Sequence, residues 1–167
     1  MRKPNRVILS ISLSAKRIGY ALFEGEVLLN FAIKSFSSPR TPDSTLRQAM
    51  GHLDKLRDQY PVGHVLIRLP RESATSPMQR YLVHNVALAF RKSGSSISFA
   101  DHNEAFRQIA GSNEFLRSNI YMMLSRSFPE LQRYTNSQNR SQREYSFVLL
   151  SAVAIGLASN SRVAGYQ

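Results

Sequence analysis

Three acidic residues in this chain stand where metal-dependent chemistry could be built. Glu72 and Asp101 each follow a short apolar run, and Glu144 opens a long apolar segment. Cleavage of a phosphodiester by two metal ions needs several carboxylates that converge on cations about 3.5–4 Å apart, because only dense negative charge holds both ions. Glu72 follows Pro70 in a predicted loop, and Asp101 also fits the cap of a helix. The three acids could therefore form a metal site only if the fold brings them together.

Serine and histidine side chains offer a second kind of chemistry. Ser10, Ser12 and Ser14 alternate along an apolar segment, and we interpret such serines as the polar face of a strand rather than as nucleophiles. His84 lies within a predicted helix, and His102 follows a predicted helix cap. Because neither histidine belongs to a Ser-His-Asp order or to metal-ligand spacing, we interpret both as core or surface residues.

Composition indicates one globular domain. The chain has 167 residues, of which 43% are hydrophobic and 20% charged, and we expect a single domain over residues 1–160 with a flexible tail at 161–167. The absence of cysteine excludes disulfides, cysteine-bound zinc and thiol catalysis, and it is compatible with a cytoplasmic location. No run reaches the roughly 20 apolar residues of a membrane span, so no membrane segment is expected.

Positive charge is the strongest compositional signal. Lys and Arg number 22 against 11 Asp and Glu, which gives a formal net charge of +11. Such a chain favours polyanionic partners, and arginine in particular suits bidentate contact with phosphate. Nucleic acid is the favoured partner, ahead of an anionic membrane surface or an acidic protein.

Hydrophobic periodicity and turn residues predict the elements that must position these groups. Three strands should form an antiparallel meander, and the later strands should join through helices. The expected strands are residues 6–12, 18–23, 27–33, 64–69 and 96–100, and the expected helices are 46–60, 77–94, 101–111, 113–128 and 144–158, with a polar surface loop at 131–142. This order predicts an α/β fold with a mixed five-stranded sheet, its first three strands antiparallel, flanked by helices.

The order of several local patterns resembles the RuvC-like branch of the RNase H-like superfamily, which includes Holliday junction resolvases. Residues 7–25, with Ile18-Gly19-Tyr20-Ala21 in the second strand, resemble the hairpin that carries the family's first catalytic aspartate. Residues 64–69 are similar to the strand that carries its glutamate, residues 105–111 resemble the segment before its penultimate helix, and residues 146–158 resemble the helix with its closing acids. The resemblance, over residues 7–158, implies the RNase H-like fold, magnesium-dependent DNA cleavage and a homodimer.

At the family's catalytic positions this sequence departs from the pattern. The first-strand aspartate is matched by Ser12, the fourth-strand glutamate by Arg68, and only Glu144 is acidic near the start of the last helix. An arginine about 4 Å from a dication would cost roughly 8 kcal/mol at an effective dielectric constant near 20. We therefore expect no metal and no cofactor, with Mg²⁺ needed only if the displaced acids form a site.

Loss of metal would leave a basic cleft. A fold of this class should bring six cationic side chains to one rim, where they could contact phosphates without reading bases. They are Lys16, Arg17, Arg68, Arg71, Arg140 and Arg143.

Three functions remain open at this point. The first is nucleic-acid binding, to DNA more than RNA, with metal-dependent cleavage lost. The second is an active Mg-dependent, structure-specific endodeoxyribonuclease with relocated acids. The third is a structural or assembly subunit that binds a protein partner through its basic face. Clustered carboxylates would favour the second, and salt-sensitive, chelator-independent binding the first.

Overall fold

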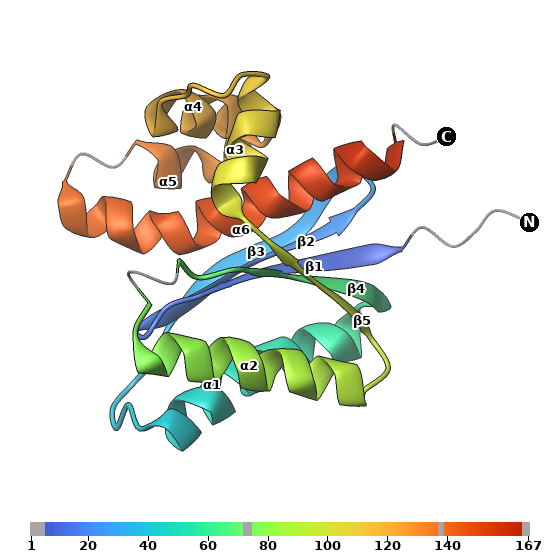
Figure 1. Cartoon of the computed structure of the whole chain (residues 1–167), viewed down its shortest axis with the longest axis vertical. Coiled ribbons are helices and arrows are strands. Elements are labelled where there is room, and N and C mark those ends of the chain that lie inside the picture. The colour runs from blue at the N-terminus through green and yellow to red at the C-terminus, as the bar shows by residue number, and fades with distance from the viewer. Residues whose placement is uncertain (1–5, 72–74, 137–138, 165–167) are drawn as a thin grey trace, which may run out of the picture.

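The core of the protein is a five-stranded mixed sheet. The computed structural model describes residues 6–71, 75–136 and 139–164. The strand order is β3-β2-β1-β4-β5, in which β1, β2 and β3 pair antiparallel while β4 runs parallel to both β1 and β5 (Figure 1). The strands are β1 Val7–Leu13, β2 Arg17–Glu24, β3 Val27–Ser35, β4 Val62–Arg68 and β5 Ser96–Ala100. The predicted sheet is confirmed.

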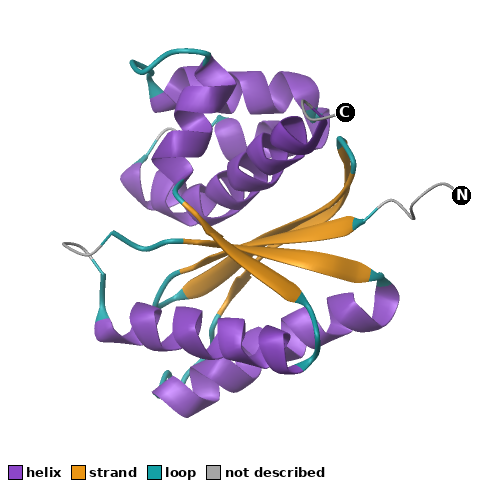
Figure 2. Ribbon diagram, turned by 45° about the vertical axis from the view of Figure 1, so that its right-hand side comes forward, coloured by secondary structure: helices purple, strands orange, loops and turns teal. Residues whose placement is uncertain are grey.

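Helices cover the sheet on both faces (Figure 2). Helices α1 (Pro42–Gln59) and α2 (Pro77–Lys92) pack on one face. The other face carries α3 (His102–Ala110), α4 (Arg117–Ser127), α5 (Gln132–Thr135) and the long α6 (Arg140–Ala164). Thr41, Ser76 and Asp101 cap the first turns of α1, α2 and α3 with their side-chain oxygens, as short polar side chains do at helix starts.

Strand β1 is buried along its whole length. Leu9, Ile11 and Leu13 belong to the core beneath α1 and α2. Because side chains alternate along a strand, Ser10 and Ser12 point to the opposite face, which α6 covers. Both serines are fully buried, so the polar face that they form lies inside the protein. Their hydroxyls lie between two layers of the protein.

Two glycines let α6 lie unusually close to the sheet. A Cβ atom at Gly19 of β2 would come within 2.3 Å of the Val148 carbonyl oxygen of α6. A Cβ atom at Gly156 of α6 would come within 2.5 Å of the Phe23 ring and 2.9 Å of Ser10 Oγ. Glycine at both positions therefore allows the short distance between the helix and the strands. This distance determines how deeply the polar side chains on this face are buried.

The chain between α4 and α6 differs from the predicted loop. A 3-10 turn at Pro129–Leu131 and helix α5 occupy part of residues 131–142, and Leu131 is fully buried. Leu131 packs with Phe128 in the core beneath α6, and this burial overrides the polar local sequence. Helix α4 also begins later than predicted, and α6 begins earlier and runs to Ala164. In the part of the chain that the structure describes, no helix is long and apolar enough to cross a membrane.

Replacing Gly156 by Ala should lower the free energy of unfolding by about 1–3 kcal/mol, because the added methyl group overpacks the helix-to-sheet contact. Gly51 in α1 gives the matched control, since a Cβ atom there meets nothing within 4 Å. Gly51→Ala should stabilise by up to about 1 kcal/mol through helix propensity. Urea unfolding of both variants measures the two effects, and equal behaviour would contradict the close packing of α6.

Candidate functional site

Arg68 places its guanidinium at the carboxyl end of parallel strands β1 and β4. Its Nε donates a hydrogen bond of 2.7 Å to Ser12 Oγ, and its Nη2 donates one of 3.3 Å to the Leu13 carbonyl oxygen. The same carbonyl accepts a 2.8 Å hydrogen bond from Gln79 Nε2, which ties α2 to this strand end. The orientation of the guanidinium plane is therefore fixed by the backbone and side chain of β1. Open α/β sheets commonly bind ligands at this edge.

Ser151 of α6 extends this network. Its Oγ lies 3.1 Å from Ser12 Oγ and 2.6 Å from the Phe147 carbonyl oxygen. Ser12 and Ser151 are fully buried, and Arg68 is only 7% exposed. Strand β1, strand β4 and the last helix thus each contribute one side chain to a connected polar cluster. Two of these side chains are neutral and the third is cationic.

Two arginine guanidiniums lie beside this cluster. The Cζ atom of Arg68 lies 5.2 Å from the centroid of the Phe147 ring, and the Cζ atom of Arg117 lies 4.8 Å from the same centroid. Burial, and then the charge of Arg117, lower the pKa of Arg68 to about 10, so it stays protonated at neutral pH. Within the described residues neither arginine forms an ion pair with an acid. Both guanidiniums can therefore receive an external anion.

His102 borders the same arginine and stays neutral. Its ring is 3% exposed and lies edge-on to Phe147, with 5.1 Å between the centroids. Burial, followed by the charge of Arg68, lowers the pKa of His102 to about 4, and the nearby carboxylate of Asp101 only partly opposes the shift. Among the described residues neither ring nitrogen has a hydrogen-bond partner. His102 is therefore buried in the core, whereas His84 is exposed on α2.

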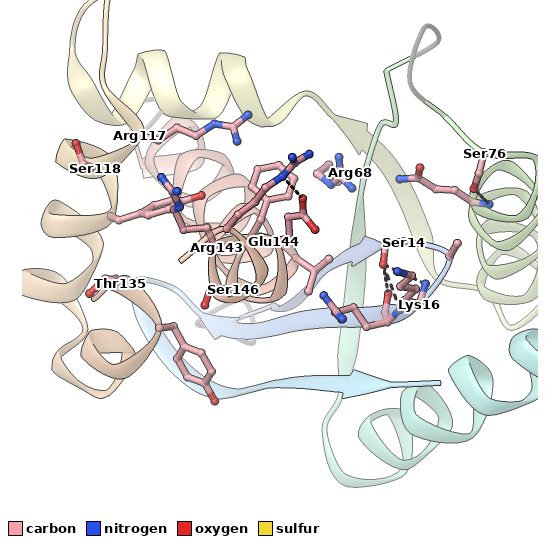
Figure 3. Close-up of a pocket in the computed structure, with 18 of the residues that line it drawn as sticks. Ser14, Lys16, Arg68, Ser76, Arg117, Ser118, Thr135, Arg143, Glu144 and Ser146 are labelled. Atoms are coloured by element: carbon pink, nitrogen blue, oxygen red, sulfur yellow. Dashed lines mark hydrogen bonds and ion pairs between the residues drawn. The ribbon is translucent and has the colours of Figure 1, made fainter. Parts of the chain in front are cut away.

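A cleft of about 860 Å³ opens over this cluster, between the β1–β2 turn, the start of α2, α4, α5 and the first turns of α6 (Figure 3). Its wall carries six cationic side chains and, among the described lining residues, a single acid, Glu144. The six are Lys16, Arg17, Arg68, Arg117, Arg140 and Arg143. Five of them were predicted from the sequence to share one rim. Arg71, the sixth predicted cation, is exposed but does not line the cleft.

Two of the three acids that could have formed a displaced metal site, Asp101 and Glu144, line different hollows. Asp101 accepts a hydrogen bond of 2.9 Å from the Asn103 backbone N–H as the cap of α3, and it lines a separate hollow beside β5. Glu144 is exposed and pairs with Arg140 at 3.1 Å. Glu72 lies outside the described residues. Over the described ranges, no group of three or more His, Cys, Asp or Glu side chains is placed to hold a metal ion.

Three contributors to the site were not predicted from the sequence. Ser151 lies within an apolar helix, where a serine often bonds only to its own helix, and nothing in its local pattern indicates a contact with β1. Arg117 is the first residue of α4, and its approach to Phe147 depends on how α4 packs. The position of Gln79 could have been predicted, because Gln79 falls in the first turn of the helix that Ser76 caps and so lies near the strand ends.

Comparisons with known proteins bear on the fold. No protein-family model matches the chain, and no curated protein sequence matches it. Among solved structures, RuvC of Thermus thermophilus superposes with a TM-score of 0.73 at 14% identity, covering 95% of this chain and 96% of that one. The same organism's RuvC in complex with a Holliday junction substrate superposes with a TM-score of 0.68 at 9% identity, and the match covers 93% of this chain and 97% of that one. The yeast mitochondrial Holliday junction resolvase Ydc2 superposes with a TM-score of 0.63 at 11% identity, and the match covers 98% of this chain and 84% of that one.

These similarities define the class of fold. The chain has an RNase H-like fold, with a mixed sheet whose first three strands are antiparallel. Within that class its architecture is RuvC-like, because RuvC and Ydc2 match it over nearly its whole length. The predicted resemblance is confirmed for the fold. At these identities the comparison describes the frame, and the chemistry of the site depends on the residues present in this chain.

The buried neutral His102 should make stability fall in acid. Its pKa is near 4 in the folded protein, below the ordinary value of 6.5. The contribution of the neutral imidazole to the free energy of unfolding is therefore complete above pH 6.5 and is lost as pH falls through 4. The shift corresponds to a loss on the order of 3 kcal/mol. His102→Phe keeps the ring contacts and should flatten the decline between pH 6.5 and 4, measured by urea unfolding.

An exposed histidine on α2 provides the control for this measurement. His84→Gln should retain the wild-type slope, because the side chain at position 84 is exposed. A His102→Phe variant with the same slope as wild type would contradict a neutral, buried imidazole beside Arg68.

Proposed function

We propose that this protein binds nucleic acid through phosphate contacts in the cleft and does not cleave it with metal ions. The observation that carries the proposal is the position of Arg68. Its buried guanidinium, hydrogen-bonded to Ser12, occupies the place where the family resemblance puts two of the metal-binding carboxylates. The residues present do not fit a pair of divalent cations.

Electrostatics support both parts of this proposal. A dication about 4 Å from Arg68 would be repelled by roughly 8 kcal/mol at an effective dielectric constant near 20, and no carboxylate of the described residues pairs with Arg68. A phosphate at the same place would be attracted by Arg68 and by Arg117, which share the Phe147 ring. The guanidinium would then neutralise the phosphate, as metal ions do in two-metal nucleases.

DNA is the proposed form of the ligand. The structural neighbours support this choice, because one is RuvC bound to a Holliday junction substrate and another is a Holliday junction resolvase. The preference for DNA over RNA rests on these neighbours and not on a base-reading contact in the cleft. The homodimer implied by the resemblance and the cytoplasmic location stay predictions.

The two other functions have less support from the site. A relocated nuclease centre would need acids that converge, but Asp101 caps α3 and Glu144 pairs with Arg140 on the cleft wall. A scaffold that binds a protein through its basic face would share the fold and the charge. It differs from the proposed function by showing little affinity for oligonucleotides near physiological salt.

Removing two cleft arginines should weaken binding and reduce its dependence on salt. In Arg117→Gln with Arg143→Gln, the slope of log affinity against log salt should fall by about 1.4–1.8, because each phosphate contact contributes about 0.7–0.9. Fluorescence anisotropy with a labelled oligonucleotide, measured at several salt concentrations, gives this slope. Both side chains are exposed, so their loss should leave the fold intact.

The control removes the same charge from the opposite face. Arg47 of α1 and Arg91 of α2 are exposed and lie on the helices that cover the other side of the sheet. Changing both to Gln should leave the slope near that of wild type. Equal losses in the two double variants would show that net charge, and not the cleft, drives association, and absence of any binding would favour the scaffold.

A further inference from the structure

We infer that the cleft receives unpaired nucleotides, with their bases stacked on its aromatic and guanidinium groups, rather than the outer surface of a duplex. The inference rests on the proposed function and specifies the form of its ligand. It is based on how arginines and aromatic rings are combined around the cleft. Charge alone would suit either form of nucleic acid.

Four arginine–aromatic contacts occur in or beside the cleft. Arg68 and Arg117 both approach the Phe147 ring. Arg17, which lines the cleft, has its Cζ 5.1 Å from the centroid of Tyr145, and Tyr145 is 38% exposed. In a fourth contact, the Arg133 Cζ lies 4.7 Å from the centroid of the Tyr134 ring. Guanidinium planes and aromatic faces are the two surfaces on which proteins stack unpaired bases.

Aromatic and aliphatic side chains share the cleft wall with these cations. Tyr121, Tyr134 and Phe147 line the cleft, and Leu116 at its edge is 65% exposed. A duplex presents its phosphates and sugars outward and keeps the faces of its bases stacked inside, so the aromatic and aliphatic side chains of the wall would gain little from it. An unpaired base has two free faces, and base-to-aromatic stacking tolerates every sequence.

Depth and size agree with this form of ligand. Arg68 lies at the floor with 7% of its surface exposed, while Arg143 and Arg117 at the wall are exposed. A flexible single strand can direct one phosphate toward the floor and the next toward the rim. The cleft volume of about 860 Å³ falls within the range in which proteins enclose small ligands, which is enough for bases to enter.

The test compares one sequence in two forms. A labelled single-stranded DNA of about a dozen nucleotides and the blunt duplex of the same sequence are titrated with the full chain in EDTA, followed by fluorescence anisotropy. The single strand should bind at least about tenfold more tightly than the duplex, given the usual strength of base stacking. This comparison needs no variant and so does not depend on the folding of one.

Tyr145 lies beside the cleft, where its ring contacts the cleft-lining Arg17, and a leucine there removes the ring and keeps apolar bulk. Tyr145→Leu should weaken single-strand binding by about fivefold or more and change duplex binding by less than about twofold. Phe99 of β5 is the matched control, because its ring is 40% exposed and it lines a different hollow. Phe99→Leu should change neither affinity. Circular dichroism melting confirms that both variants are folded.

Each outcome decides between the possibilities. Tighter binding of the single strand, lost in Tyr145→Leu and kept in Phe99→Leu, supports the inference. Duplex binding as tight as single-strand binding, or equal losses for both forms in Tyr145→Leu, would overturn the inference while leaving the proposed function in place. Failure of both forms to bind would overturn the proposed function itself.

Discussion

The hydrogen bond from Arg68 to Ser12 is the interaction on which the site depends. A buried guanidinium is costly unless its donors are satisfied and its charge is compensated. Here Ser12 and the Leu13 carbonyl satisfy two donors, while no carboxylate among the described residues compensates the charge. The remaining charge is directed to the cleft, where an anion would supply what the protein lacks. The proposed site would therefore bind anions, whereas the carboxylates of a two-metal centre bind cations.

The fold serves this arrangement through the close packing of α6. Gly19 and Gly156 allow the helix to approach β1 and β2 so closely that the Ser151 hydroxyl comes within 3.1 Å of Ser12 Oγ. The parallel pairing of β1 with β4 then brings Arg68 to the same point, because Ile11 pairs with Ile67 one residue earlier. The fold is RuvC-like, and Ser12 and Arg68 stand at two positions at which the resemblance implies acids.

Much of the frame could be predicted from sequence because it follows from local patterns. Alternating and continuous apolar runs gave the five strands, and Ser76 and Asp101 gave two helix starts through their capping oxygens. The burial of Ser10 and Ser12 could not be predicted, since it depends on α6 returning to cover that face. Ser151 and Arg117 were missed for the same reason. Their roles come from long-range packing, whereas Lys16, Arg17, Arg140 and Arg143 lie in turns and helix ends that the fold class itself places at one rim.

The most direct test of the central claim compares binding with and without divalent cations. The affinity of the wild-type chain for a labelled DNA oligonucleotide is measured in EDTA and in Mg²⁺ at matched ionic strength, and the DNA is examined for cleavage after incubation. If Arg68 occupies the place of the metals, the two affinities should agree and the DNA should remain intact. Cleavage in Mg²⁺, or binding that requires Mg²⁺, would contradict the account.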